Sequence, residues 1–410
     1  MQIKRDFYLN QLIDRKNNGM IKIVSGLRRC GKSYLLSELF TEHLFSCQVN
    51  KDHIININLD TRDDAKYRDP DVCNDYVKSL IKDSDTYYLL LDEVQLMDEF
   101  VSVLNGFLRL KNLDIYVTGS NSKFLSSDIV TEFRGRGDEI RVHPLTFSEI
   151  YPLYNEDWNK AWSDYTIYGG IPLVFLYKKD EDKVKLLKNL LKETYLKDLI
   201  ERNNIKNIEE FEELLQILAS TIGALVNPKK LEDTFRSVKH VDLTAPTIKQ
   251  YLDYLQDAFF VSKVLRYDIK GKKYISTPFK CYLTDIGLRN ACLDFRQIEA
   301  THIMENIIYN ELQMRGYSVD VGSVVIGAGK TVEVDFVVNQ GYKKYYIQSA
   351  LALPTPEKII QEEKSLLSIK DGFKKIIITN NNILKPYQDT NGITIMSLKD
   401  FLLNVNSLDL

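Results

Sequence analysis

The sequence predicts a multidomain protein that begins with an α/β domain built on a parallel sheet. Short apolar runs alternate with helical patterns, which is typical of parallel strands joined by crossover helices; these runs are residues 21–25, 54–59, 87–91 and 115–118. With 410 residues the chain exceeds what one hydrophobic core supports, so we expect two or three domains. Hydrophobic residues make up 44% and charged residues 27%, which is the composition of a globular chain and excludes a disordered or fibrous one.

Bulk charge and cysteine usage narrow the class of protein. The formal net charge of −3 gives no global basic signal, so contact with nucleic acid would depend on local patches. Five scattered cysteines without a C-x-x-C pair suit a reducing compartment, which predicts a cytoplasmic protein. No apolar stretch approaches the roughly 18 residues that span a bilayer, and the N-terminus leads into no apolar segment, so we expect neither membrane insertion nor export.

The first chemical motif follows the first predicted strand. Residues 26–33 fit the pattern G-x-x-x-x-G-K-[ST] and stand between an apolar strand and a helical pattern, as a phosphate-binding loop requires. The glycines allow backbone N–H groups to surround phosphate, while Lys32 would reach the β- and γ-phosphates and Ser33 would ligate Mg²⁺. The expected contacts to ATP are Gly26, Leu27, Arg28, Arg29, Cys30, Gly31, Lys32, Ser33 and Tyr34.

Two carboxylates end the strand predicted at residues 87–91. Asp92 would hold the Mg²⁺ shell and Glu93 would polarise the attacking water. Taken alone, two acids at a strand end are more often a solvated terminus than a site. Together with the phosphate loop they predict hydrolysis of ATP.

Two further segments provide candidate site residues. The strand at residues 115–118 would end beside the phosphate loop, so Asn121, or Ser120, is a candidate sensor of the γ-phosphate. Arg134 and Arg136 flank a glycine, and a guanidinium there would neutralise transition-state charge, often at a neighbouring subunit's site. A basic surface turn is the alternative interpretation of the two arginines.

These residues resemble the prokaryotic AAA+ ATPases of the archaeal-type P-loop group that carry an uncharacterised C-terminal domain. The resemblance covers nearly the whole chain and is carried by residues 26–33, 91–93, 118–122, 134–136 and 285–289. It implies a Walker A and Walker B pair, Asn121 as polar sensor, Arg134 or Arg136 as arginine finger, and a ring or other homo-oligomer.

The middle of the chain changes pattern. Residues 183–203 are rich in Leu and Lys at helical spacing, and three short helical patterns follow at 211–223, 229–236 and 247–257, then an apolar run at 259–265. Three helices and a β element predict a winged helix, which the resemblance also implies. Five cations against one acid between Val261 and Lys273 would form a basic wing able to meet double-stranded DNA. Winged helices also dock proteins, so DNA and a protein partner both stay open.

The last part of the chain resembles the PD-(D/E)xK core of restriction-endonuclease-like nucleases over residues 300–378. A helix at 300–314 carries Glu305, and two strands at 331–338 and 343–348 carry Asp335 and Gln348. Nuclease chemistry needs a second acid and a lysine to serve the metal and the water. Gln348 and Ala350 stand in those two places, so we expect a degenerate site; Lys358 or Lys364 is the alternative source of an amine, and Glu333 of a carboxylate.

The sequence thus predicts four regions: an AAA+ P-loop domain at 1–150, a helical lid or linker at 151–204, a winged helix at 205–295 and a nuclease-like domain at 296–410. The leading hypothesis is a Mg-dependent ATPase that moves or regulates its C-terminal parts. The alternatives, in order, are a nucleotide-gated switch with little turnover that binds DNA or protein, an ATP-controlled metal-dependent nuclease, and a small-molecule kinase.

Overall fold

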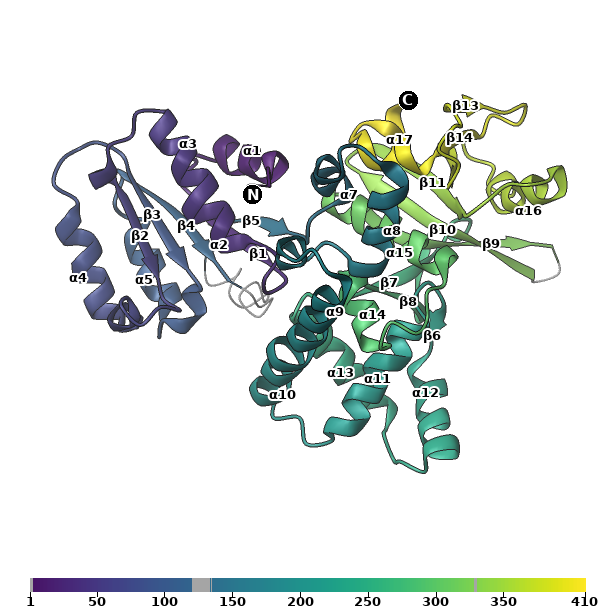
Figure 1. Ribbon diagram of the computed structural model, residues 1–410, viewed down its shortest axis with the longest axis horizontal. Coiled ribbons are helices and arrows are strands. Elements are labelled where there is room, and N and C mark those ends of the chain that lie inside the picture. Colours follow the sequence, from purple (N-terminus) through teal and green to yellow (C-terminus); the bar gives the residue numbers. More distant parts are fainter. Residues whose placement is uncertain (1–2, 120–132, 134, 328–329) are drawn as a thin grey trace. The chain divides into compact units, whose positions relative to one another are not determined.

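The computed structural model describes residues 3–119, 133, 135–327 and 330–410, with Lys239 described by its backbone alone. The chain forms two compact units (Figure 1). We call residues 1–144 with 257–259 the N-terminal unit, and residues 145–256 with 260–410 the C-terminal unit. The predicted residues Ser120, Asn121 and Arg134 lie outside the described part of the chain.

The N-terminal unit is built on a five-stranded sheet of order β2-β3-β4-β1-β5, in which every pairing is parallel. Its strands are β1 (Ile21–Gly26), β2 (Ile54–Asn58), β3 (Tyr87–Asp92), β4 (Leu113–Thr118) and β5 (Gly137–Val142). Strands β1, β3 and β4 are buried at every position, which explains their continuous apolar runs. The predicted parallel α/β domain is confirmed.

One helix of this unit precedes β1, and the others lie between successive strands. The helices are α1 (Asp6–Asp14), a helix formed by α2 (Lys32–Tyr34), a π-helical segment (Leu35–Phe40) and α3 (Thr41–Ser46), then α4 (Pro70–Leu80) and α5 (Phe100–Phe107). Asp69 begins α4 by accepting hydrogen bonds from two backbone N–H groups of its first turn. Because these crossovers bring every carboxyl strand end to one edge, polar residues at strand ends gather there.

The C-terminal unit contains a nine-stranded mixed sheet of order β13-β14-β12-β11-β10-β9-β7-β8-β6. Its strands are β6 (Leu225–Val226), β7 (Val261–Asp268), β8 (Lys273–Leu283), β9 (Ser318–Ile326), β10 (Lys330–Gln340), β11 (Lys343–Ala350), β12 (Lys374–Thr379), β13 (Tyr387–Gln388) and β14 (Thr394–Ser397). Strand β7 pairs in parallel with β9, with Arg266 opposite Val321. This pairing joins the β7–β8 hairpin to the strands that follow it, so residues 205–295 and 296–410, predicted as separate domains, share one sheet. The four-part division itself stays a prediction.

The C-terminal unit also contains helices, several of which form a group below the sheet in Figure 1. Its helices are α7 (Phe147–Ile150), α8 (Trp158–Tyr168), α9 (Asp180–Asn189), α10 (Lys197–Asn203), α11 (Ile208–Ser220), α12 (Pro228–Thr234), α13 (Ala245–Asp257), α14 (Ile286–Cys292), α15 (Ala300–Met314), α16 (Pro356–Leu367) and α17 (Leu398–Leu403). The predicted helix at 300–314 and the two strands after it are present. Within the described part of the chain, no helix is long and apolar enough to cross a membrane.

The segment 285–289 forms a packing junction inside the C-terminal unit. The Asp285 carboxylate caps α14 and accepts a hydrogen bond of 2.7 Å from the N–H of Gly170. Gly287 lies so close to α8 that a Cβ atom there would stand 2.0 Å from the carbonyl oxygen of Tyr168. The segment therefore binds α14 to the end of α8, which is a structural role.

Arg289 and Asn290 complete this junction. Arg289 is fully buried, and its Nε donates to the carbonyl oxygen of Ala219 in α11 over 2.8 Å. Asn290 donates from Nδ2 to the carbonyl oxygen of Thr166 in α8 over 2.9 Å. Helices α8, α11 and α14 are thus joined by buried polar side chains.

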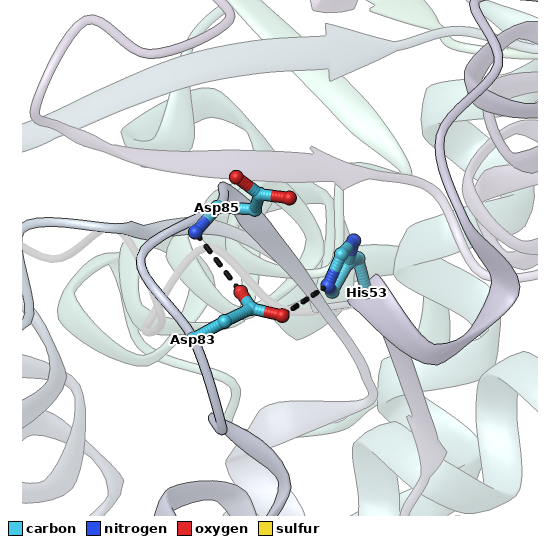
Figure 2. A group of neighbouring side chains, drawn as sticks. All are labelled: His53, Asp83 and Asp85. Atoms are coloured by element: carbon cyan, nitrogen blue, oxygen red, sulfur yellow. Dashed lines mark hydrogen bonds and ion pairs between the residues drawn. The ribbon is translucent and has the colours of Figure 1, made fainter.

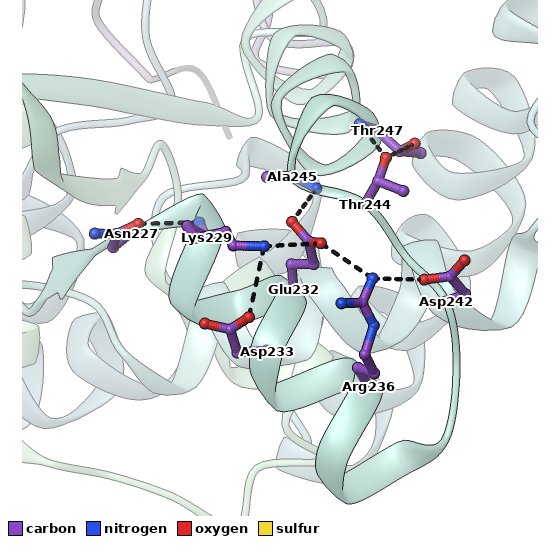
Figure 3. A network of polar contacts seen from close by, with 9 residues as sticks. All are labelled: Asn227, Lys229, Glu232, Asp233, Arg236, Asp242, Thr244, Ala245 and Thr247. Atoms are coloured by element: carbon purple, nitrogen blue, oxygen red, sulfur yellow. Dashed lines mark hydrogen bonds and ion pairs between the residues drawn. The ribbon is translucent and has the colours of Figure 1, made fainter.

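A network of charged side chains holds the turn between α12 and α13 (Figure 3). Glu232 accepts hydrogen bonds from the N–H of Ala245 over 3.1 Å, from Lys229 over 3.0 Å and from Arg236 over 3.2 Å. Arg236 also pairs with Asp242 at 2.9 Å. The hydrogen bond from Lys229 and that from Ala245 lower the pKa of the Glu232 carboxyl. The network therefore fixes the start of α13 and engages two cations of this region internally.

Candidate nucleotide-binding site

The phosphate loop leaves β1 at a glycine that the structure requires. Gly26 has a φ of 134°, and a Cβ atom at this position would lie 2.1 Å from the carbonyl oxygen of Val142 in β5. Gly31 and Arg29 also adopt positive φ angles, of 98° and 64°. Together they turn the backbone tightly before the helix that begins at Lys32.

Lys32 folds back over the loop. It is 3% exposed, and its Nζ donates to the carbonyl oxygens of Gly26 and Leu27 over 3.0 and 3.1 Å. The side chains of Leu27 and Cys30 are buried, so these two predicted contact residues can reach a nucleotide only through their backbone. The side chains of Arg29 and Tyr34 are exposed, and that of Arg28 is half-buried.

Ser33 and Asp92 bring two oxygen donors together at the start of the helix. The Ser33 hydroxyl donates to Oδ1 of Asp92 over 3.0 Å, although the two residues are far apart in sequence. Burial raises the pKa of Asp92, while hydrogen bonds from Thr118 and Ser33 work in the opposite direction. Hydroxyl and carboxylate oxygens are the donors that Mg²⁺ prefers, so these residues fit the ion that the sequence implies.

Thr118, the last residue of β4, connects both acids of this site. Its buried hydroxyl donates to Oδ1 of Asp92 over 2.5 Å and accepts from the N–H of Glu93 over 2.9 Å. Glu93 has a φ of 53°, and its carboxylate accepts a hydrogen bond from Gln95. Sequence reasoning assigned no role to Thr118; a threonine that ends a buried strand next to an acid-terminated strand is the signal that would have found it.

Arg136 lies at the end of the sheet opposite to the phosphate loop. Arg136 is exposed and directly precedes β5, where its carbonyl oxygen accepts from the N–H of Ile21 over 2.8 Å. Because β1 and β5 run parallel for six residues, Arg136 stands roughly 20 Å along the strands from the phosphate loop. Arg136 therefore does not line the loop of its own chain.

An N-terminal arginine, not selected from the sequence, supports the loop from behind. Arg5 is 3% exposed and donates to the carbonyl oxygens of Cys30 and His143 over 2.8 and 2.9 Å. Burial, and then the charges of Arg141 and Arg5, hold the pKa of His143 well below its usual value, so this imidazole is neutral. No local pattern reveals Arg5, because its partners lie 25 and 138 residues away.

A second polar group lies just before β2 and β3, at the opposite end of the sheet from the phosphate loop. Figure 2 shows its three side chains. One ligand atom each of His53, Asp83 and Asp85 lie within 4.8 Å of one another. Asp83 already accepts hydrogen bonds from His53 over 3.1 Å and from the N–H of Asp85 over 2.9 Å, and both aspartates are exposed. These bonds account for the group as a polar turn.

The acids predicted for the nuclease-like site come together in the C-terminal unit. Glu305 on α15, and Glu333 and Asp335 on β10, all face Lys280 of β8. The Lys280 Nζ lies 2.9 Å from Glu305 Oε1, 2.8 Å from Glu333 Oε1 and 3.9 Å from Asp335 Oδ1. We call these four residues the Lys280 cluster.

Of the two substituted positions, Gln348 lies beside this cluster. Asp335 accepts at Oδ2 from the N–H of Ser349 over 2.8 Å, and its own N–H points to Gln348 Oε1 over 3.5 Å. Lys358, one predicted source of an amine, pairs with Glu362 on its own helix. The amine that reaches the acids is Lys280, which sequence reasoning did not select because it precedes Glu305 by 25 residues on a separate hairpin.

Comparison with known proteins agrees with the fold and the loop. Residues 18–151 match the AAA domain family, and residues 159–299 match a domain of unknown function (DUF8612). An uncharacterized protein of Haemophilus influenzae is 33% identical over 410 residues, which covers 98% of this chain and 98% of that protein. An uncharacterized protein of Methanocaldococcus jannaschii is 30% identical over 403 residues, which covers 93% and 85%.

Two solved structures have weaker likeness. The ORC1 protein of Aeropyrum pernix in complex with DNA is 10% identical, covers 72% of this chain and 93% of its own, and has a TM-score of 0.30. AMPPCP-bound DnaA of Aquifex aeolicus is 14% identical, covers 60% and 85%, and has a TM-score of 0.27. TM-scores this low establish nothing about the function of this chain.

The parallel sheet, the phosphate loop and the family match define an AAA+ P-loop nucleotide-binding protein. The chain belongs to the same family as the Haemophilus influenzae and Methanocaldococcus jannaschii proteins, which it matches over nearly its whole length.

Proposed function

We propose that this protein is a Mg-dependent ATPase that couples its nucleotide cycle to its C-terminal unit. The observation that carries the proposal is the chain of hydrogen bonds from Ser33 through Asp92 and Thr118 to the backbone of Glu93. It links the helix after the phosphate loop to the ends of β3 and β4. The backbone of the residue that carries the second acid is thereby held next to the residue proposed to ligate Mg²⁺.

Each residue of the site has a defined role in the proposed reaction. Lys32 and the N–H groups of the loop bind the phosphates, and Ser33 and Asp92 hold Mg²⁺. When held there by Ser33 and Asp92, Mg²⁺ would supply positive charge to the phosphate oxygens. Glu93 orients the attacking water and accepts its proton, while Thr118 fixes both acids.

The arginine finger and the sensor complete the proposal. Asn121 is proposed as the sensor of the γ-phosphate, and Arg134 or Arg136 as the arginine finger. The position of Arg136, at the sheet edge away from its own loop, favours action on the site of a neighbouring copy. This role requires a homo-oligomer, which we propose as the working form.

The order α11-β6-α12-α13-β7-β8 supports a winged helix, whose wing is the β7–β8 hairpin. Of the wing's cations, Arg266 donates to Ser323 and Lys270 to the carbonyl oxygen of Val325, whereas Lys272 and Lys273 are exposed at the tip. We propose that this tip contacts either the phosphates of double-stranded DNA or a protein partner. The exposed face of α13 carries Lys249 and also Asp253, which gives it little net charge for DNA.

Helix α15 with β10 and β11 supports a nuclease-like core for residues 296–410, with Glu305, Asp335 and Gln348 as its degenerate site. DNA cleavage that is lost in Asp335→Ala and retained in Lys32→Ala would instead favour an ATP-controlled nuclease.

Steady-state ATP hydrolysis by the full chain with Mg²⁺, with and without duplex DNA, tests the proposal. We expect turnover in the wild type, loss of turnover with retained ATP binding in Glu93→Gln, and loss of binding in Lys32→Ala. A change of rate on adding duplex DNA, absent when Lys272 and Lys273 are both replaced by Ala, would assign the wing to DNA. Binding without turnover in every condition refutes the ATPase and leaves a nucleotide-gated switch for a protein partner.

A further inference from the structure

The Lys280 cluster concentrates charge in a largely buried part of the C-terminal unit, with only the Glu333 side chain, at 35%, substantially exposed. Lys280 is 2% exposed, Glu305 7% and Asp335 8%. A buried ammonium is stable only where acids and hydrogen-bond acceptors surround it. Lys280 meets this condition with three carboxylates, supplied by α15 and β10.

A divalent metal does not fit this arrangement. Divalent ions such as Mg²⁺ bind carboxylate oxygens at about 2.0–2.6 Å and need a clear centre between them. Here the Lys280 Nζ stands at that centre, 2.9 Å from Glu305 and 2.8 Å from Glu333. The same Glu305 oxygen also accepts from the Tyr282 hydroxyl over 2.6 Å, so two hydrogen bonds occupy this oxygen while Lys280 is in place.

The surroundings of the cluster leave little room for rearrangement. A Cβ atom at Gly223 would lie 2.9 Å from Glu305 Oε2, so the backbone closes the far side of this carboxylate. Asp335 is held at its other oxygen by the N–H of Ser349. Two of the three acids are therefore fixed toward Lys280 by protein groups.

The protonation of the cluster agrees with an internal cation. Burial lowers the pKa of Lys280, but the charges of Glu305, Asp335 and Glu333 outweigh it and raise the pKa above its usual value. Burial and the charge of Glu305 raise the pKa of Asp335. The raised pKa of Lys280 keeps its ammonium protonated. The raised pKa of Asp335 favours the protonated carboxyl, which reduces the excess of negative over positive charge in the cluster.

We propose that Lys280 is the built-in cation of this site: its ammonium takes the place that a divalent metal would occupy in a nuclease-like core. The C-terminal unit then needs no metal there and binds none. The ion pairs instead hold β8, and with it the proposed wing, to α15 and β10. This inference rests on the proposed nuclease-like core but not on ATP hydrolysis, so Mn²⁺ binding tests it separately from ATP turnover.

The test is a titration of the nucleotide-free full chain with Mn²⁺, followed by electron paramagnetic resonance, with Asp92→Asn in every sample to remove the phosphate-loop site. We expect no bound Mn²⁺ at millimolar concentration in this background. Adding Lys280→Ala should vacate the centre and create one Mn²⁺ site, with a Kd at least about tenfold below the highest Mn²⁺ concentration at which the background binds none. A further Asp335→Asn change should abolish that site, and Lys273→Ala, an exposed lysine of the same strand, should create none.

Two results would overturn the proposal. The first is Mn²⁺ binding in the background sample that Asp335→Asn removes, because the cluster would then be a metal site with Lys280 displaced. The second is a folded Lys280→Ala chain, judged by circular dichroism, that gains no Mn²⁺ site. If Lys280→Ala does not fold alone, Lys280→Gln, which keeps a hydrogen-bond donor, replaces it, and refolding by Mn²⁺ becomes an additional expected result.

Discussion

Replacing Thr118 with Val removes one hydroxyl and leaves the shape of the side chain. The hydroxyl donates to Asp92 and accepts from the N–H of Glu93. A hydrogen bond to a charged group contributes about 1.5–3 kcal/mol, and an unsatisfied buried donor costs about 1–3 kcal/mol. Because the added methyl group recovers some apolar contact, we expect a loss of about 3 kcal/mol in the free energy of unfolding of the N-terminal unit. For a unit of this size that corresponds to a drop of about 6–12 °C in Tm.

Differential scanning calorimetry of the full chain measures this loss, and Thr118→Ser is the matched control because it keeps the hydroxyl. ATP hydrolysis provides the second measurement: Thr118→Val should lower kcat, since both acids lose a positioning contact, while Thr118→Ser stays near wild type. Equal Tm values for the Val and Ser variants would refute the reasoning, because the hydroxyl would then contribute nothing to the site.

Two further predictions concern the C-terminal unit. Gly287→Ala places a methyl group 2.0 Å from the carbonyl oxygen of Tyr168, so α8 and α14 must separate. The free energy of unfolding, measured by urea denaturation, should fall by about 3 kcal/mol or more. Gly372→Ala is the control, because open space surrounds this glycine, and it should change the free energy of unfolding by less than about 0.5 kcal/mol. Burial raises the pKa of Asp285 from 3.8 to about 6 against three backbone hydrogen bonds. The folded state therefore holds this proton more tightly than the unfolded state. The contribution of Asp285 to the free energy of unfolding is fully present below pH 4, and about 3 kcal/mol of it is lost as pH rises through 6. Asp285→Asn should remove that component of the pH profile; an unchanged profile would contradict it.

The candidate sites of the N-terminal and C-terminal units differ in how many of their residues can be predicted from local sequence. In the N-terminal unit, strand patterns and the loop motif located β1, β3 and β4 within one or two residues, and they selected Lys32, Ser33 and Asp92. They succeed because each parallel strand is a continuous apolar run and the loop is a contiguous motif. Thr118 ends the strand predicted at residues 115–118, but its role depends on its contacts with Asp92 and Glu93 at the end of the neighbouring strand β3.

The C-terminal unit shows the limit of local sequence. The patterns predict the helix at 300–314 and the strands at 331–338 and 343–348 but not β9 between them, and the resemblance to the nuclease core selects Glu305 and Asp335. Neither selects Lys280, because nothing near it in sequence indicates that β7 pairs in parallel with β9 and carries β8 to the acids. The same pairing places strands from two predicted regions in one sheet, while the division into four regions stays a prediction.

The sequence alone determined the α/β class of the first domain, the phosphate loop and the acids that follow it, because those features are encoded in contiguous residues. Only the tertiary structure decided that Thr118 joins both acids, that Arg5 supports the loop, and that Lys280 occupies the centre of the C-terminal acids. Each of these depends on side chains that meet across strands or helices distant in sequence, and such contacts follow from sheet order rather than from any local pattern.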